Sequence, residues 1–443
     1  MTTTSSDEAL LQLGYQPSLR RNLSFASICV YGLLFFVPLA PVAVFGPVVN
    51  LSGGVPVLVY LVAALVMGAS ALSYREMALR YPVAGSVYGY ARLSVGPRFG
   101  FVAGWLILLD YLLMPALLVV LAAVALAHVV PVPVWVIVVA FAVLSMALNL
   151  AGLEITTRVG LALLAVQAVV LGAFVWFVGA AVASGTIELS LHALWRPGTS
   201  LAAVFGAASI AALSYLGFDA IATLNEEAKG GGRAVGWATM LLLGVVTGLF
   251  CLQVFAASLV SDATRFAAGA ATDRAFYTAV DAVAPAWFTP VFTVVNAFVA
   301  IFACLVVAHA ATARLLFAMA RDRVLPAGLA VTSKGVPARA IVLTCGLAVA
   351  LGLTFSSRLG LLTSLVTFGA LSAYVLLHVS VVVRCMVVER TGRWFVHGVV
   401  PVFGAATLLA ILANTQPLTR TIGLSWLAVG ILAAVAGHRI RRR

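Results

Sequence analysis

Two apolar stretches decide the fold of this chain: LLFFVPLAPVAVFGPVV, from Leu33 to Val49, and AALSYLGFDAIATLNEEAKGGG, from Ala211 to Gly232. Each has the composition of a membrane helix but is interrupted near its middle by proline or glycine. In lipid, such a break is tolerated only where protein or a water-filled cavity receives the freed N–H and C=O groups. Breaks at matching positions, in the first and sixth apolar segments, predict a transporter built from inverted repeats, with its binding site near the middle of the bilayer.

The composition of the chain is that of a multi-pass membrane protein. Of its 443 residues, 63% are hydrophobic and only 9% are charged, which no ordinary soluble domain shows. The apolar stretches are about 20 residues long, enough to cross a hydrocarbon core about 30 Å thick. We therefore expect an all-α membrane protein with about twelve transmembrane helices. They are predicted near residues 23–50, 55–80, 99–127, 132–151, 158–183, 200–226, 234–260, 288–319, 339–355, 359–387, 396–413 and 421–438.

The positions of the basic residues predict the orientation. The net charge is +12. When both termini are placed in the cytoplasm, most Lys and Arg fall on the inner side, which is the positive-inside rule. This pattern favours a cell-membrane protein with cytoplasmic termini and argues against nucleic acid as a partner. The basic end HRIRRR fits the same orientation role, with contact to anionic lipid as the alternative. The outer basic residues are Arg196, Arg265, Arg274, Arg358 and Arg420.

The sequence shows no motif for a cofactor, a metal ion or an enzymatic reaction. The five cysteines have spacings that match no metal or redox motif, and the six histidines form no pair at helical ligand spacing. No nucleophile and base pair is recognisable, so we do not expect an enzyme. The glycines 230–232 are predicted to form a flexible inner loop that ends the sixth helix.

Four segments resemble helix motifs of the amino acid, polyamine and organocation permease superfamily. They are SALSYREMALRYPVAGSVYGYA (Ser70 to Ala91), WLILLDYLLMP (Trp105 to Pro115), SYLGFDAIATLNEEAKGG (Ser214 to Gly231) and ATARLLFAMARDRVLP (Ala311 to Pro326). The YPVAGS and LDYLL elements are most similar to the putrescine importer branch. The resemblance implies the leucine-transporter fold, in which helices one to five and six to ten form a 5+5 inverted repeat and helices eleven and twelve are peripheral.

This resemblance sets the expected organisation of the chain. The predicted regions are a cytoplasmic tail (1–19), a transport core (20–387) with repeats at 20–183 and 200–387, helices eleven and twelve (388–438), and a basic cytoplasmic tail (439–443).

The chain departs from the superfamily at two places. Members typically break helix one with a Gly-Ser-Gly type motif whose N–H groups hold the substrate carboxylate. Here that stretch contains Val37, Pro38 and Ala40, and proline has no N–H to donate. In helix five, Gln167 stands where some proton-coupled members place a lysine. The first departure weakens the expectation of the usual carboxylate site, and the second weakens the expectation of the lysine switch found in those proton-coupled members.

Two acidic residues are the main candidates for the site. Asp110 lies about 11 residues into the third helix, roughly 16 Å deep. Asp219 directly follows the break at Gly217. Charged groups at such depth are costly and usually functional, so both are predicted to bind substrate or protons. The structural alternatives are that Asp219 caps the inner half-helix and that Asp110 bonds to a neighbouring helix.

Aromatic side chains complete the predicted substrate site, together with the backbone at the two breaks. The predicted backbone positions are Val37, Pro38 and Ala40 at the first break and Leu216, Gly217 and Phe218 at the second. Tyr111, Tyr215, Phe218 and Trp105 are predicted to form an aromatic lining that attracts ammonium groups, and packing in the core is an equal alternative.

On the inner face, ion pairs are expected between Glu76, Glu226 and Glu227 and the neighbouring arginines. These pairs are expected to be exposed, each contributing about 0 to 1 kcal/mol.

These features favour a secondary active permease for a small cationic amine or amino acid. A polyamine such as putrescine is preferred, with proton coupling through Asp219 or Asp110 during alternating access. The alternative is an importer or exchanger of neutral or cationic amino acids, which would use the N–H groups around Leu216, Gly217 and Phe218. An ion channel is the remote alternative. The expected partners are this substrate, protons and the lipid bilayer.

Overall fold

A computed structural model describes residues 8, 10–15, 19, 21–126, 132–261, 272, 274–333, 335–415 and 417–440. Most of the predicted tail 1–19, Arg20, Arg265 and the end of the basic tail, 441–443, lie outside the described residues. The described chain is helical apart from turns, connecting segments such as 184–200, and two isolated β-bridges.

The membrane-spanning elements follow the order predicted from hydropathy. Eleven described helices are long and apolar enough to cross a membrane, or twelve if the bent pair α2 and α3 is one span. This confirms an all-α membrane fold. The first half contains α2 (Phe25–Phe36), α3 (Pro41–Ser52), α4 (Pro56–Arg80), α5 (Ser86–Ser94), α6 (Pro97–Leu126), α7 (Val134–Ala151) and α8 (Leu153–Ala183). The second half contains α9 (Leu201–Ala211), η1 (Ala212–Tyr215), α10 (Phe218–Ala222), α11 (Gly231–Val260), α13 (Ala275–Val283), α14 (Phe288–Val294), η2 (Val295–Ala300), α15 (Ile301–Arg321), η3 (Ala327–Ala330), α16 (Ala338–Phe355), α17 (Leu359–Val381), η4 (Val382–Val388), η5 (Phe395–Val399), α18 (Val400–Ala413) and α19 (Pro417–Ile440).

The first break lies where the prolines predicted it. α2 ends at Phe36, and Val37 has a φ of 50°, which a β-branched residue rarely adopts. α3 begins at Pro41 in the first helical position, where proline loses no hydrogen bond, and the two helices are bent by 52°. Gln253 Nε2 on α11 donates a hydrogen bond of 2.9 Å to the freed carbonyl of Pro38. Another helix therefore satisfies the interrupted backbone.

The second break depends on a glycine. α9 continues into the short 3₁₀ turn η1, and α10 begins after Gly217, whose φ is 123°. A Cβ at Gly217 would lie 1.9 Å from Phe35 Cδ1, at the end of α2. The glycine thus permits both an unusual backbone conformation and the close approach of the two broken helices.

The glycines 230–232 do not form the predicted loop. Gly231 and Gly232 belong to the first turn of α11, and Gly230 is its N-cap. A Cβ at Gly232 would lie 1.8 Å from the carbonyl oxygen of Ala78 near the end of α4. The absence of side chains lets α11 pack directly against α4, so the prediction of a flexible loop was wrong.

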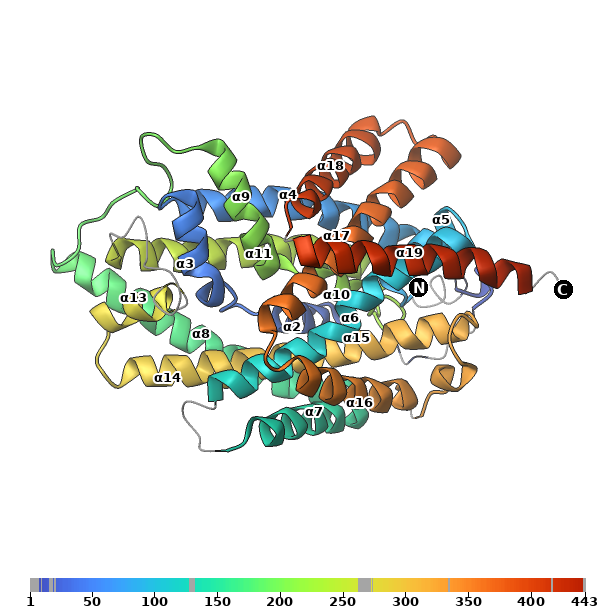
Figure 1. Cartoon of the computed structure of the whole chain (residues 1–443), viewed down its shortest axis with the longest axis horizontal. Coiled ribbons are helices and arrows are strands. Elements are labelled where there is room, and N and C mark those ends of the chain that lie inside the picture. The colour runs from blue at the N-terminus through green and yellow to red at the C-terminus, as the bar shows by residue number, and fades with distance from the viewer. Residues whose placement is uncertain are drawn as a thin grey trace.

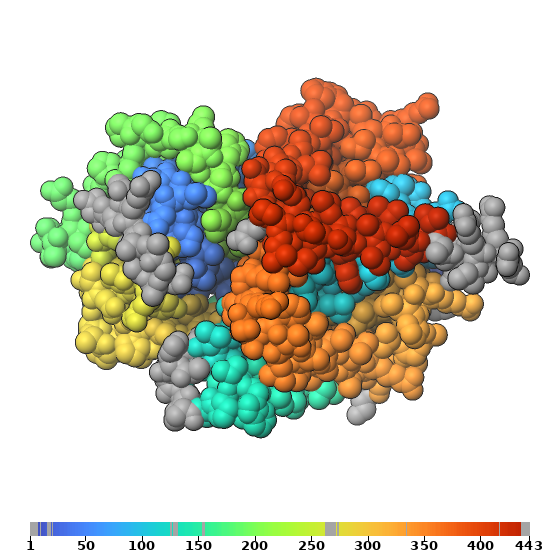
Figure 2. Space-filling view, viewed as in Figure 1, coloured from blue at the N-terminus to red at the C-terminus, as the bar shows by residue number. Residues whose placement is uncertain are grey.

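The broken helices occupy the centre of the molecule. Figure 1 shows α2 and α10 in the middle, while α18 lies at the edge of the view. Figure 2 shows α19 lying across the surface of the molecule. The last two spans, Phe395–Ala413 and Pro417–Val435, are the least buried, at 22% and 17% of their apolar windows. They are therefore peripheral to the site.

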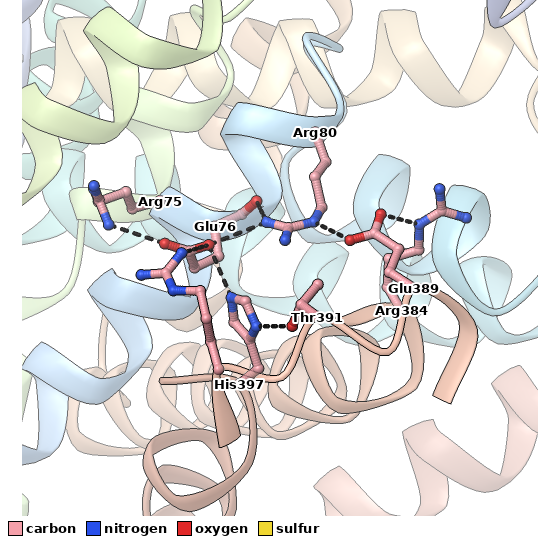
Figure 3. Close-up of polar contacts among 8 residues, drawn as sticks. Arg75, Glu76, Arg80, Arg384, Glu389, Thr391 and His397 are labelled. Carbon is pink, nitrogen blue, oxygen red and sulfur yellow. Dashed lines mark hydrogen bonds and ion pairs between the residues drawn. The ribbon is translucent and has the colours of Figure 1, made fainter. Parts of the chain in front are cut away.

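A polar cluster joins α4 to the segment between α17 and α18. Figure 3 shows Arg80 and His397 converging on Glu76, whose side chain is 2% exposed. Arg80 Nη1 and His397 Nε2 lie 3.1 and 3.0 Å from Glu76 Oε2. Glu389 accepts hydrogen bonds from Arg80 Nε at 3.0 Å and Arg384 Nε at 2.8 Å. Burial favours a higher pKa for Glu389, but these two arginines hold the pKa below its ordinary value.

Candidate functional site

Asp219 is held at the second break by two tyrosines. The carboxylate is buried, with 1% of the residue exposed. Tyr111 on α6 donates a hydrogen bond of 2.6 Å to Oδ2, and Tyr374 on α17 donates one of 2.8 Å to Oδ1. Asp219 also lies in the first turn of α10, where backbone dipoles favour a negative charge. Asp219 is not the cap of this helix, because Gly217 is the N-cap residue and no side-chain cap hydrogen bond is formed there.

Aromatic rings form a cluster next to this carboxylate. Tyr74 packs edge-on against Phe218 and Tyr374, with ring centroids 5.5 and 5.6 Å apart. Phe218 and Tyr374 are 5.3 Å apart, and Phe36 at the end of α2 lies 6.4 Å from Phe218. The rings come from both broken helices and from α4 and α17. Such an aromatic environment can hold an organic cation through the ring faces.

Asp110 lies next to Tyr111 on α6 and is 4% exposed. Its Oδ1 is buried and accepts no hydrogen bond within the described residues. Its carboxylate is close enough to Asp219 for an electrostatic interaction. α17 approaches closely here, because a Cβ at Gly369 would lie 2.7 Å from Asp110 N. Two acidic groups from different helices therefore share one buried region.

Two predicted aromatic residues have other contacts. The Tyr215 hydroxyl donates to the Tyr60 carbonyl at 3.1 Å, and its ring lies 5.1 Å from Phe250 on α11. Trp105 stacks on Trp426 of α19 at 4.3 Å, and each indole donates a 2.8 Å hydrogen bond to the other residue's carbonyl. The structure does not place these rings in the Asp219 cluster. Trp105 attaches the peripheral helix α19 to α6.

The predicted backbone positions lie at the two breaks. Val37, Pro38 and Ala40 form the turn between α2 and α3, where Ala40 N donates to Val37 O at 2.8 Å. Leu216 N donates to Leu213 O at 3.2 Å, which closes η1. Gly217 brings this second turn against the end of α2. The two breaks therefore meet, as a shared binding region requires.

The buried arginine of α15 does not neutralise either aspartate. Arg314 Nε pairs with Glu227 Oε1 at 2.5 Å, and Arg314 Nη1 donates to Tyr31 OH at 3.0 Å. Among the described residues, no arginine or lysine forms an ion pair with Asp110 or Asp219. Within the described part of the chain, this region therefore has acidic side chains without a basic partner.

A buried ion pair joins the segment after α10 to the end of α15. Glu226, which follows α10, receives two hydrogen bonds from Arg321 at 2.7 and 2.9 Å, and one from Ala84 N at 2.9 Å. The predicted ion pairs are confirmed for Glu226 and Glu76. Their carboxylates are only 2% exposed, so the expectation of exposed pairs was wrong.

Sequence reasoning missed Tyr74 and Tyr374. Tyr74 was quoted only as part of a helix motif, and Tyr374 lies in a long apolar helix without a break. The only sequence signal for these two residues was a tyrosine hydroxyl within a predicted membrane helix. Tyrosines are common in membrane cores, so it did not distinguish these two from packing residues.

Comparison with known proteins identifies the family. Residues 23–435 match the amino acid permease family. The chain belongs to this family. This permease is 30% identical over 428 residues to the low-affinity putrescine importer PlaP of Escherichia coli K12, covering 94% of this chain and 93% of that protein. It is 26% identical to the branched-chain amino acid permease BcaP of Bacillus subtilis, with 94% and 93% coverage.

A solved structure shows the same fold. The permease superposes on Mhp1, a nucleobase-cation-symport-1 family transporter, solved in a closed conformation with bromovinylhydantoin bound. The TM-score is 0.57 at 15% identity, covering 95% of this chain and 94% of that chain. The permease is therefore a multi-pass membrane transporter of the leucine-transporter fold, as predicted.

Proposed function

We propose that this permease is a secondary active importer of a small organic cation, with a diamine such as putrescine as the preferred class. The observation that carries the proposal is the buried Asp219 carboxylate, which accepts hydrogen bonds from Tyr111 and Tyr374 next to an aromatic cluster and has no basic partner among the described residues. An ammonium group would supply the missing positive charge and contact the ring faces. The putrescine importer PlaP among the relatives supports this choice.

Asp110 adds a second acidic group for the same substrate. A diamine carries two ammonium groups, and Asp110 and Asp219 lie within electrostatic range of each other. In this proposal one carboxylate binds each end of the substrate, or one binds the substrate while the other binds a proton. After the cation leaves, proton uptake by either carboxylate removes an uncompensated buried charge, which couples transport to protons.

The proposed cycle places both termini in the cytoplasm of the cell. Basic residues gather at the end that carries Arg80, Arg321 and Arg384, which the positive-inside rule assigns to the cytoplasm. The Glu226–Arg321 pair then lies on the inner side of Asp219 and closes the path. Breaking this pair would open the site inward.

An amino acid substrate is the second candidate function. The first N–H groups of a helix have no carbonyl partner within that helix, so those of α10 at Phe218 and Asp219 can receive a carboxylate. The BcaP relative and the family's description favour this alternative.

Uptake into proteoliposomes distinguishes the candidates. Labelled putrescine, leucine and lysine are compared with and without an imposed proton gradient. We expect putrescine uptake, stimulation by internal alkaline pH, and competition by other diamines. Competition by neutral amino acids without competition by diamines would establish the second candidate. Ionic currents at rates far above those of a carrier would instead indicate a channel.

A further inference from the structure

A cavity of about 230 Å³ lies where the spans α6 and α19 end, away from the Asp219 region. It is lined by α5, the first turns of α6, the turn after α15 and the last turns of α19. Arg92, Arg98 and Arg323 all line it. Since spans end here, the cavity lies at the depth of the lipid headgroups.

The cavity carries excess positive charge. Asp322 is the single acidic residue among its described lining residues. Its carboxylate already pairs with Arg92 and accepts a hydrogen bond of 2.6 Å from Tyr88 OH. Arg92 is engaged with Asp322, whereas Arg98 forms no ion pair with a described residue, so an anion in the cavity would gain a positive partner there.

The start of α6 adds hydrogen-bond donors to the same cavity. α6 runs for 30 residues from Pro97, so the N–H groups of Arg98 and Phe99 precede any helical carbonyl that could accept them. Gly100 N already donates to Gly96 O at 2.9 Å. Pro97 and Arg98 line the cavity, which places this helix terminus beside the arginines. Phosphate oxygens suit such a terminus.

The rest of the lining is apolar and belongs to a lipid-facing helix. Phe101, Val324, Ala433 and Ala434 complete the cavity. The span that ends at Val435 is only 17% buried, and Figure 2 shows α19 on the surface of the molecule. A soluble anion would gain nothing from this wall, whereas an acyl chain would bury apolar surface against it.

We propose that this cavity binds an anionic glycerophospholipid. Its phosphate contacts Arg98, Arg323 and the start of α6, and an acyl chain lies along Phe101 and α19. The positive-inside rule accounts for the number of arginines on this face. It does not require them to converge with a helix terminus and an apolar wall in one cavity.

Native mass spectrometry of the purified full-length permease tests the proposal. The protein is titrated with phosphatidylglycerol, with phosphatidylcholine, and with glycerol 3-phosphate as the soluble headgroup. The variants are Arg98→Gln, Arg323→Gln and Ala433→Phe. The last of these narrows the apolar side of the cavity without changing its charge. Arg233→Gln is the matched control, because Arg233 is exposed in the first turn of α11 and lines a different pocket.

We expect phosphatidylglycerol to bind more tightly than phosphatidylcholine, by about fivefold for each arginine that contributes. Arg98→Gln and Arg323→Gln should each remove one such factor, Ala433→Phe should also weaken phosphatidylglycerol binding, and Arg233→Gln should leave it unchanged. Equal binding of the two lipids, or equal losses in Arg233→Gln, would overturn the proposal. Tight glycerol 3-phosphate binding that Ala433→Phe does not alter would overturn the lipid assignment in favour of a soluble phosphate site.

Discussion

The Tyr111 hydroxyl donates a hydrogen bond of 2.6 Å to Asp219 Oδ2, although 108 positions separate the two residues. This contact joins the unbroken helix α6 to the short helix α10 that follows the second break. Tyr374 makes the equivalent contact to Oδ1 from α17. If α10 moves relative to α6 and α17, these hydrogen bonds must break or the tyrosines must move with Asp219. The hydrogen bonding of Asp219 is therefore linked to the conformation of the site.

The first prediction concerns Asp110. If it pairs with an ammonium group, Asp110→Asn keeps the shape, removes the charge, and should weaken binding of the best amine by about 2 to 5 kcal/mol. Calorimetry on the purified protein measures this loss. Asp110→Glu is the control and should retain part of the affinity. Unchanged affinity in Asp110→Asn would leave Asp219 as the principal cation ligand.

The second prediction concerns the glycine at the second break. Gly217→Ala should abolish uptake, because the new Cβ would lie 1.9 Å from Phe35 Cδ1 and the φ of 123° disfavours a side chain. Gly206→Ala on α9 is the matched control, since its Cβ would come no closer than 3.7 Å to Leu51. Uptake and surface expression are measured for both. Normal uptake by Gly217→Ala would show that the close approach of the breaks is dispensable.

The third prediction concerns the buried pair of Arg314 and Glu227. Arg314→Met leaves a buried carboxylate without its partner and should lower the free energy of unfolding by about 3 to 5 kcal/mol. Adding Glu227→Met should recover much of this loss, because both charges are then gone. Thermal unfolding in detergent compares the single and double variants. A double variant less stable than Arg314→Met would mean that the pair does not determine stability here.

The fourth prediction follows from Glu389 and its two arginines. Its folded-state pKa is held below the ordinary value of 4.5, so Glu389 contributes stability above that pH and loses it as pH falls through the lower folded pKa. The melting temperature of Glu389→Gln should lie slightly below that of the wild type at pH 7. The two should converge in acid, once the pH falls below the folded-state pKa of Glu389.

Melting curves from pH 7 to pH 3 in constant salt measure this difference. Arg358→Gln, which is remote in sequence from the cluster, serves as the control. The difference between its melting temperature and that of the wild type should not shrink as the pH falls. A gap between Glu389→Gln and the wild type that widens in acid would contradict the assignment.

The sequence by itself determined the membrane-spanning segments and the two breaks. These features are local: about twelve apolar segments of spanning length, the prolines at 38 and 41, and the glycine at 217. The transfer of an apolar segment into lipid depends on that segment alone, and the missing N–H of a proline interrupts a helix wherever the helix packs. The helical motifs added the family and its fold. Asp110 and Asp219 stood out because charge in a membrane segment is costly wherever the helix packs.

Only the tertiary structure decided which side chains meet. Tyr111 and Tyr374 reach Asp219 because α6 and α17 pack around α10, and hydropathy along one helix does not specify which face turns toward a partner. The same packing directs Tyr215 toward α11 and Trp105 toward α19, and turns the glycines at 231 and 232 from a loop into a helix contact. Rotation of each helix is set by side-chain packing over many residues at once, and a local pattern does not contain that information.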